Sequence, residues 1–342
     1  MTKILAAVAL HAQRVHLTPC SGGPPHGLDA AAKGIGTMDA CTRVGVVMLS
    51  AAAVLGCASP TRPIDWDRLQ AEARLVDSPP GLHVLSGQGR QTWTDGEVTL
   101  RTVPLGLAGA SGLRLVADVR GKTAGPVPFI VDTGSTGSIV SWASPLADEL
   151  IVSRSKTFHV AAGRADSGYM GSLPRVSIGS MWTSDLAVGV VEKPSTNAEP
   201  MNILGMIHLF HTQLNYDGAW TLRSGAFRRD PLPAAWTMVQ FEQGTPFVRI
   251  VDSEGNTRFG VIDTGAPRSV VAQGLPEGEY VIPATDGTAA MRVQVSGTAP
   301  WGELKIAGYT ISLFIGMDVL ESRPSRMTFD QGVWAIAPSD PR

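Results

Sequence analysis

The chain has 342 residues, which is enough for two domains of ordinary size. It is 44% hydrophobic and 17% charged, with 38 glycines and 24 prolines, a composition that excludes a disordered or fibrous protein. The net charge of −2 and the lack of a dense lysine or arginine run give no support for nucleic acid as a partner. The three cysteines, at positions 20, 41 and 57, all precede residue 60, so the rest of the sequence has neither a disulfide nor a cysteine metal site.

The N-terminal region has the pattern of an export signal. Arg43 is followed by an apolar run over residues 44–55 and then by small residues. The run is too short for an ordinary membrane-spanning helix, which needs about 20 apolar residues. Its end at Cys57 resembles a bacterial lipobox, although Val54 and Leu55 stand where Leu and a small residue are commonest. The resemblance implies lipidation of Cys57, with ordinary secretion and a retained anchor as the alternatives.

Residues 1–37 do not fit this plan, because an export signal begins a few residues before its cation. Met38 stands shortly before Arg43. We therefore expect Met38, rather than Met1, to be the start, with the upstream stretch a misassigned extension. Intact-mass or N-terminal analysis of the native protein tests this, and a native peptide from residues 1–37 would contradict it.

The segment after Cys57 changes from tether to helix. A Ser/Pro/Thr/Arg stretch is followed by apolar residues at helical spacing, which predict a helix over residues 64–75. Ser78-Pro79-Pro80-Gly81 ends it, and residues 82–100 are expected to be extended. The sequence leaves open whether residues 58–100 act as a propeptide.

From Thr102 onward the pattern is that of strands and turns. Apolar runs predict strands, and Gly163 to Gly168 predicts the turn of a projecting hairpin. The strands expected in the first half cover residues 103–107, 113–119, 129–131, 139–141, 158–162, 169–173, 176–178 and 186–191.

The second half repeats the order of the first. Residues 314–317 (Phe-Ile-Gly-Met) correspond to residues 203–206 (Ile-Leu-Gly-Met). Trp220 and Trp334 occupy matching places near the end of each copy, and we interpret both as packing residues. The chain is therefore a diverged duplication rather than a short-period solenoid.

Each copy contains one Asp-Thr-Gly motif. An apolar strand ends in Asp132-Thr133-Gly134, and a second one ends in Asp263-Thr264-Gly265. A lone Asp-Thr-Gly is most often a turn with a capping Asp. Two copies in matched context instead indicate two lobes that each bring one carboxylate to a shared site.

These motifs, with the later apolar-apolar-Gly elements, resemble the aspartic proteases over roughly residues 100–340. One such unit per chain is similar to the retropepsins, which act as homodimers, whereas two per chain resembles the pepsin-like enzymes. The spacing and the Asp-Thr-Gly-Ala-Pro form of the second motif are more similar to the retropepsins than to the pepsin-like enzymes. The resemblance implies a mostly β fold, with two similar retropepsin-like (acid protease) β-barrel lobes and an active-site cleft between them. We divide the chain into an upstream extension and signal (1–57), a tether and N-terminal segment (58–100), a first lobe (101–228) and a second lobe (229–342).

The resemblance also implies the chemistry. Asp132 and Asp263 would share one proton, as dyads of this family do, because two close carboxylates do not both ionise. Gly134 and Gly265 allow the chain to bend there, while the supporting Thr133 and Thr264 would hydrogen-bond across the lobes.

The two motifs differ just after the glycine. Ser135 has a hydroxyl that can donate to Asp132, whereas Ala266 has none for Asp263. The sequence therefore predicts that Asp132 is the more acidic partner. Arg268 is close in sequence and is expected to be solvated.

Family flaps often carry a tyrosine. Tyr169 lies in the expected hairpin of the first half and is the flap candidate. The second copy is shorter between its Asp-Thr-Gly and Ile315, so we expect it to lack a flap.

Two function classes remain open. We expect an aspartic-type endopeptidase, a hydrolase that needs no cofactor and no metal, acting as a monomer on a peptide or protein substrate. The alternative is a catalytically silent peptide-binding module of the same fold. His208 and His211 are spaced like a metal pair but lack an evident third ligand. The signal implies an exported protein, lipid-anchored at the bacterial envelope on the periplasmic side or outer membrane.

Overall fold

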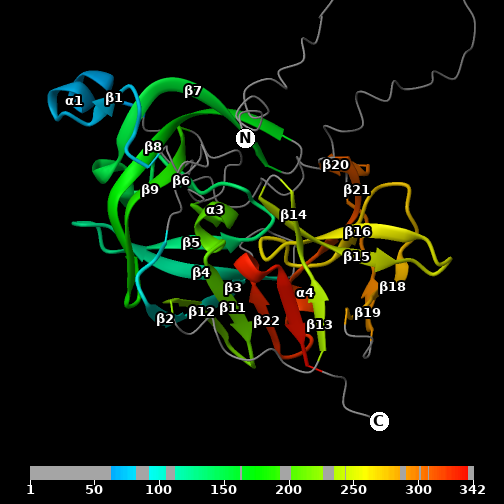
Figure 1. The fold of residues 1–342 in the computed structure, drawn as a ribbon. Helices are drawn as coiled ribbons and strands as arrows, with labels where there is room; N and C mark the ends of the chain where they lie inside the picture. The colour runs from blue at the N-terminus through cyan, green and yellow to red at the C-terminus, as the bar shows by residue number, and fades with distance from the viewer. Residues whose placement is uncertain are drawn as a thin grey trace, which may run out of the picture. The chain divides into compact units, whose positions relative to one another are not determined.

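The computed structural model describes residues 63–81, 92–104, 112–161, 164–192, 202–225, 235–242, 244–285, 290–299, 302–306 and 308–337. All of them lie in one compact unit, Cys57–Arg342, and they are mostly β (Figure 1). Met38, the signal segment and the lipidation candidate Cys57 lie outside the described residues, as does the expected lobe boundary at residues 228–229. Within the described residues, no helix is both long enough and apolar enough to cross a membrane.

The first lobe is built on a sheet of nine strands. Their spatial order is β1-β7-β8-β9-β6-β10-β5-β4-β3, with a further pairing between β8 and β4. The strands are β1 (Leu75–Val76), β3 (Arg101–Pro104), β4 (Leu113–Arg120), β5 (Pro126–Asp132), β6 (Ile139–Ser141), β7 (Ile151–Ala161), β8 (Arg164–Ile178), β9 (Met181–Val191) and β10 (Ile203–Gly205). A short 3-10 helix, Pro145–Glu149, precedes β7, and helix α3, Met206–Leu209, follows β10.

The second lobe is built on a sheet of eight strands. Its main path is β17-β21-β16-β15-β18-β19, with β14 paired to β15 and β20 paired to β21. The strands are β14 (Gln240–Glu242), β15 (Thr245–Val251), β16 (Thr257–Ile262), β17 (Val270–Val271), β18 (Gly278–Ile282), β19 (Met291–Val295), β20 (Leu304–Ile306) and β21 (Tyr309–Ile315). Helix α4, Met317–Leu320, follows β21 just as α3 follows β10.

A third sheet joins the two halves. Its order is β13-β23-β22-β11-β12-β2, so β11 from the first half pairs with β22 from the second. The strands are β2 (Gly96–Thr99), β11 (Thr212–Tyr216), β12 (Trp220–Ser224), β13 (Ala235–Met238), β22 (Ser325–Thr328) and β23 (Val333–Ile336), with a 3-10 helix, Phe329–Gln331, between the last two. In Figure 1 this sheet combines green strands of the first half with red strands of the second. One strand from each copy therefore pairs directly with a strand from the other copy in this sheet.

The N-terminal segment packs onto the first lobe. Helix α1 runs Trp66–Ala71 and ends earlier than the predicted residue 75. The backbone N–H of Arg74 donates to Leu69 O, and Leu75–Val76 then leave the helix to pair with β7 as β1. Leu69 is 1% exposed. The described residues between 63 and 81 are therefore part of the folded unit.

The hairpin of the first lobe is longer than predicted. Residues 164–168, expected to form its turn, belong to β8 and pair with β7, as in Thr157↔Gly168 and Ala161↔Arg164. The ladder extends this far because both strands keep their register beyond Lys156↔Tyr169. Of the strand predicted over residues 103–107, residues 103 and 104 lie in β3, and residues 105–107 lie outside the described residues.

The core is continuous between the lobes. One cluster of buried apolar side chains includes Leu115 and Phe129 of the first sheet and Ile250 and Leu313 of the second. Trp220 and Trp334 are 2% and 1% exposed, which confirms that they are packing residues. Both tryptophans belong to the joining sheet, so burial there stabilises the two lobes together.

Candidate active site

Each Asp-Thr-Gly stands where a central strand ends. Asp132 is the last residue of β5, which pairs in parallel with β10 so that Gly205 lies opposite Asp132. Asp263 follows β16, which pairs in parallel with β21 through Ile262↔Ile315. The apolar-apolar-Gly elements therefore flank the aspartate strands in both lobes.

Only glycine fits beside each motif. A Cβ on Gly205 would lie 2.6 Å from the carbonyl carbon of Gly137, and one on Gly316 would lie 2.5 Å from that of Arg268. The backbone N–H of Gly205 donates to Ser138 Oγ at 3.0 Å, and that of Gly316 donates to Ser269 Oγ at 2.9 Å. The tight approach holds each loop against its neighbouring strand.

The partners of these two serines differ between the lobes. Ser138 Oγ lies 2.6 Å from His208 Nδ1, whereas Ser269 Oγ donates to Asp318 Oδ1 at 2.7 Å. His208 is 1% exposed, and burial lowers its pKa to about 3. The imidazole is therefore neutral at ordinary pH and serves as a packing partner.

The two threonines cross between the loops. Thr133 Oγ1 donates to Ile262 O at 2.8 Å and accepts from the Thr264 N–H at 3.0 Å. Thr264 Oγ1 donates to Val131 O at 2.6 Å and accepts from the Thr133 N–H at 3.1 Å. Both threonines are fully buried. The structure thus has the cross-lobe hydrogen bonds that the resemblance implied.

The carboxyl group of each aspartate lies against the glycine of the other motif. A Cβ on Gly134 would lie 2.6 Å from Asp263 Cγ, and one on Gly265 would lie 2.6 Å from Asp132 Cγ. The side chains of Asp132 and Asp263 hydrogen-bond to each other. Any larger residue at either glycine would displace the opposite carboxylate.

Backbone donors hold both carboxylates. Asp132 Oδ1 accepts from the Ser135 N–H at 3.0 Å, and Asp263 Oδ1 accepts from the N–H groups of Gly265 at 2.9 Å and Ala266 at 3.1 Å. The predicted bond from the Ser135 hydroxyl to Asp132 is wrong, since this hydroxyl donates to Gly137 O at 2.8 Å. The Gly137 carbonyl of the same loop is the acceptor instead.

The two aspartates differ in acidity. Burial raises the pKa of Asp132, while the hydrogen bond from Asp263 opposes the rise. Burial also raises the pKa of Asp263, and the negative charge of Asp132 raises it further, well above its usual range. These two directions favour the shared proton on Asp263, and the pair titrates as a unit.

Arg114 is the residue near this pair that our reading of the sequence missed. Its guanidinium charge lowers the pKa of Asp132. The pairing of β4 with β5 reaches Val116↔Ile130, and the same register continued by two residues along each strand brings residue 114 opposite residue 132. Arg268, which was expected to be solvated, is exposed.

Tyr169 lies on the long hairpin, six residues from its turn. It pairs with Lys156 and Val190 in the sheet, and its ring contacts Trp66 of α1 at a centroid distance of 4.9 Å. This position is in the body of the hairpin rather than at its tip. Among the described residues of the second lobe, the strands in the corresponding place, β18 and β19, are shorter.

The histidine pair is split. His208 is buried against Ser138, while His211 Nδ1 lies 3.7 Å from Asp330 Oδ2. Within the described ranges, no group of three or more His, Cys, Asp or Glu side chains could hold a metal ion.

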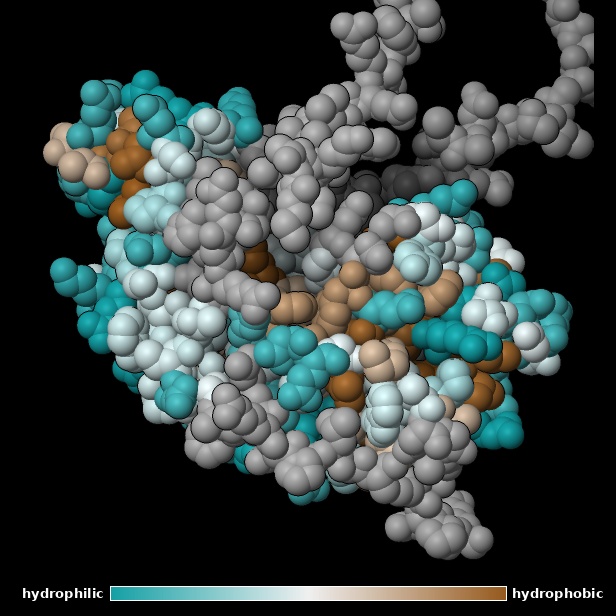
Figure 2. Space-filling model, viewed as in Figure 1, coloured by the Kyte–Doolittle hydropathy of each residue, from teal (hydrophilic) through white to brown (hydrophobic). Residues whose placement is uncertain are grey.

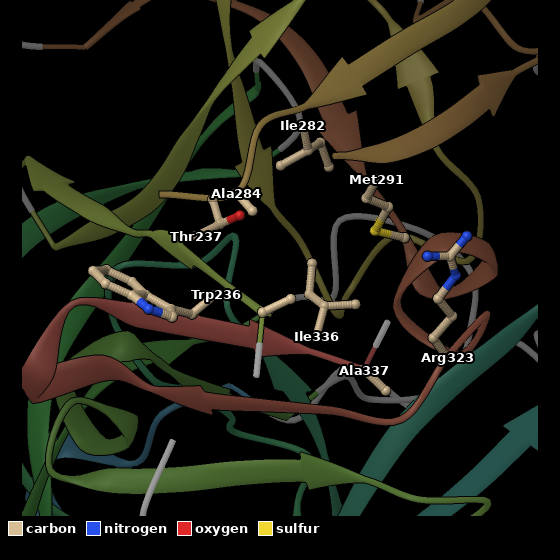
Figure 3. Close-up of a pocket in the computed structure, with 9 residues that line it drawn as sticks. Trp236, Thr237, Ile282, Ala284, Met291, Arg323, Ile336 and Ala337 are labelled. Carbon is tan, nitrogen blue, oxygen red and sulfur yellow. The ribbon is translucent and has the colours of Figure 1, made fainter. Parts of the chain in front are cut away.

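The pocket in Figure 3 lies away from both aspartates. It holds about 10 Å³, roughly the space of one water molecule. Side chains of β13, β18, β19 and β23 surround it, among them Trp236, Ile282, Met291 and Ile336.

A larger, open groove of about 400 Å³ lies over Thr257, Arg258, Glu303 and Tyr309 of the second lobe. In Figure 2, apolar residues gather at the centre of the visible face.

Comparisons with known proteins agree with this geometry. Residues 115–207 match a family model described as aspartyl protease. The fold is similar to an aspartic proteinase from Irpex lacteus (TM-score 0.52, 14% identity, covering 72% of this chain and 98% of that one). It is also similar to basic 7S globulin from soybean (TM-score 0.51, 10% identity, covering 72% and 95%). No curated protein matches the sequence. The chain thus matches an aspartyl protease model over residues 115–207, and its fold is similar to that of a pepsin-like aspartic proteinase.

Proposed function

We propose that the chain is an aspartic endopeptidase that hydrolyses peptide bonds with a water activated between Asp132 and Asp263. The observation that carries this proposal is the carboxyl pair itself. The two groups hydrogen-bond to each other, share burial and differ in acidity. Four threonine hydrogen bonds fix the loops that carry them. One protonated and one ionised carboxyl is the arrangement that general acid–base hydrolysis needs.

Each carboxyl has a separate role in this reaction. The ionised Asp132 takes a proton from water as the water oxygen attacks the carbonyl carbon. The protonated Asp263 gives its proton to the carbonyl oxygen, so the intermediate is a neutral gem-diol. The proton taken by Asp132 then moves to the leaving nitrogen as the C–N bond breaks, and Asp263 recovers a proton from the gem-diol. No covalent enzyme intermediate forms.

The substrate would bind as an extended peptide. Strand edges pair with a peptide backbone through its N–H and C=O groups, which gives affinity with little dependence on sequence. The hairpin of β7 and β8 is the projecting element of the first lobe, and residues 157–161 and 164–169 continue its ladder. We propose that this hairpin covers the peptide as a flap, without assigning that role to Tyr169.

A second candidate is a peptide-binding module that does not cut. The similarity to a protein named as a globulin shows that this fold is not confined to proteinases. The intact carboxyl pair favours the enzyme, because a binding module has no need of two buried carboxyls that share a proton.

Cleavage of a mixed peptide library separates the two candidates. We expect the wild type to cut, a statine-type transition-state analogue to inhibit it, and both Asp132→Asn and Asp263→Asn to be inactive. The matched control is Asp217→Asn, since Asp217 is exposed in a turn of the joining sheet and should leave activity unchanged. Binding of the peptides without cleavage by the wild type would instead support the binding module.

The location is a proposal from sequence alone. We propose that the protein is exported, anchored by a lipid on Cys57 at the bacterial envelope, and acts there as a monomer. Incorporation of labelled palmitate that Cys57→Ala abolishes would support the anchor, and secretion of an unlabelled protein would overturn it.

A further inference from the structure

We propose that Arg114 is a positioning residue that fixes which aspartate of the pair is ionised. The inference rests on the proposed function, because it concerns the same carboxyl pair. It assigns the asymmetry of the dyad to a residue far from either Asp-Thr-Gly, in place of the Ser135 hydroxyl.

The register of the first sheet brings Arg114 to Asp132. Strands β4 and β5 are antiparallel, and their pairing reaches Val116↔Ile130. If the same register is continued by two residues along each strand, Arg114 lies opposite Asp132. Side chains directly opposite each other on neighbouring strands lie about 5 Å apart at Cβ, which is within reach of a long guanidinium.

Alternation along β4 places Arg114 on the same face as Asp132. Leu115 and Ala117 are buried in the core cluster, so the even-numbered residues of β4 point to the opposite face. Arg114 itself is partly exposed. The arginine therefore borders the carboxyl pair without entering the core.

The start of β4 is fixed against the second loop. A Cβ on Gly112 would collide with the side chain of Pro267, which follows Ala266. On its other side, Arg114 pairs with Val103 of β3. The strand that carries Arg114 is thus held between its own sheet and the loop of the other lobe.

The second lobe has no arginine at the equivalent place. Strands β15 and β16 are antiparallel with Phe247↔Val261, so the residue opposite Asp263 is Thr245. Thr245 is neutral and 5% exposed. The pair therefore has a cation on the Asp132 side and a neutral residue on the Asp263 side.

The charges agree with this placement. The groups that act on Asp132 are Asp263 from the second loop, the N–H groups of Gly134 and Ser135, and the Arg114 guanidinium. The Arg114 charge lowers the pKa of Asp132. Burial lowers the pKa of Arg114, and the Asp132 charge partly opposes that change. A cation on one side alone stabilises the singly ionised pair in one of its two forms, with the charge on Asp132.

The test compares the pH dependence of Arg114→Gln and Arg114→Lys with that of the wild type. We expect the acid limb of kcat/KM to move up by about one pH unit in Arg114→Gln, a tenfold loss on that limb, and to move less in Arg114→Lys. Arg101→Gln is the matched control, because Arg101 on β3 forms an exposed ion pair with Asp118 and should leave the limb in place.

A second readout does not need cleavage. Carboxyl ¹³C NMR of aspartate-labelled protein, assigned with Asp132→Asn and Asp263→Asn, follows the pair directly. We expect its lower titration to rise in Arg114→Gln. An unchanged lower titration in both variants overturns the role of Arg114 while leaving the endopeptidase intact. An inactive wild type whose lower titration still depends on Arg114 overturns only the endopeptidase.

Discussion

The two lobes share a frame and differ in what surrounds it. In both lobes, a strand that pairs in parallel with the aspartate strand ends at or just before a glycine that packs directly against the aspartate loop. In both loops, a serine at the same position accepts a hydrogen bond from the N–H of that glycine. Around this frame, the first lobe has a long hairpin, a buried imidazole and an arginine beside its aspartate, while the second has short strands, Asp318 and Thr245. The shared strands and loops bring the two carboxyl groups together, and the residues around them make the two groups differ in acidity.

The largest effect is expected where the shared frame is tightest. Gly205→Ala and Gly316→Ala each place a Cβ against the backbone of a motif loop, so each should lower the free energy of unfolding by more than about 3 kcal/mol. Urea denaturation measures this.

The controls for these glycines have open space around the added carbon. Gly125→Ala in the first lobe and Gly302→Ala in the second have no atom within 4 Å of the new Cβ. A loss in only one of the two frame variants would show that the lobes do not share the same constraint.

The crossed threonines give the next effect. Thr133→Ala and Thr264→Ala each leave buried backbone groups unpaired, which costs about 1–3 kcal/mol of stability. Because the bonds are reciprocal, we expect similar losses and a double variant that loses less than their sum. Strict additivity in a thermodynamic cycle would contradict the coupling.

The buried imidazole should make the first lobe sensitive to acid. The pKa of His208 is about 3 in the folded chain and 6.5 unperturbed, so below pH 6.5 the unfolded chain binds a proton that the folded chain does not. Stability contributed by the neutral His208 is therefore complete above pH 6.5 and falls toward pH 3, by up to about 1.4 kcal/mol per pH unit. Unfolding free energies of the wild type and His208→Gln across this range should differ in slope by one proton. Parallel curves would contradict the buried neutral state.

The smallest effect is expected at Ser135, where the two Asp-Thr-Gly motifs first differ in sequence. Ser135→Ala removes a hydroxyl that bonds Gly137 O rather than Asp132, and the Ser135 N–H to the carboxylate remains. The acid limb of the pH–rate profile should stay where it is. An upward shift would show that the hydroxyl reaches Asp132 when substrate is bound.

The frame could be predicted from the sequence, whereas the acidity difference between the two aspartates was predicted in the right direction but from the wrong residue, the Ser135 hydroxyl. Repeated motifs identified the aspartates, the bracing glycines and the threonine pair, because each is a short local phrase. Arg114 and Thr245 depend on strand register through a hairpin, and a shift of one residue would move either to the other face. The Ser135 hydroxyl had two acceptors within reach, and only the conformation of its loop decides between them. Strands β2 and β13 had weak local signals and exist through their partners in the joining sheet.

The pairing of β11 with β22 also sets the order in which the protein can be completed. Gln213 and Thr328, which hydrogen-bond between these strands, are 115 positions apart. A chain made from its N-terminus therefore exposes the edge of β11 until β22 has been synthesised. An open strand edge invites pairing with other chains, so we expect chains that stop before β22 to aggregate rather than to yield a usable single lobe.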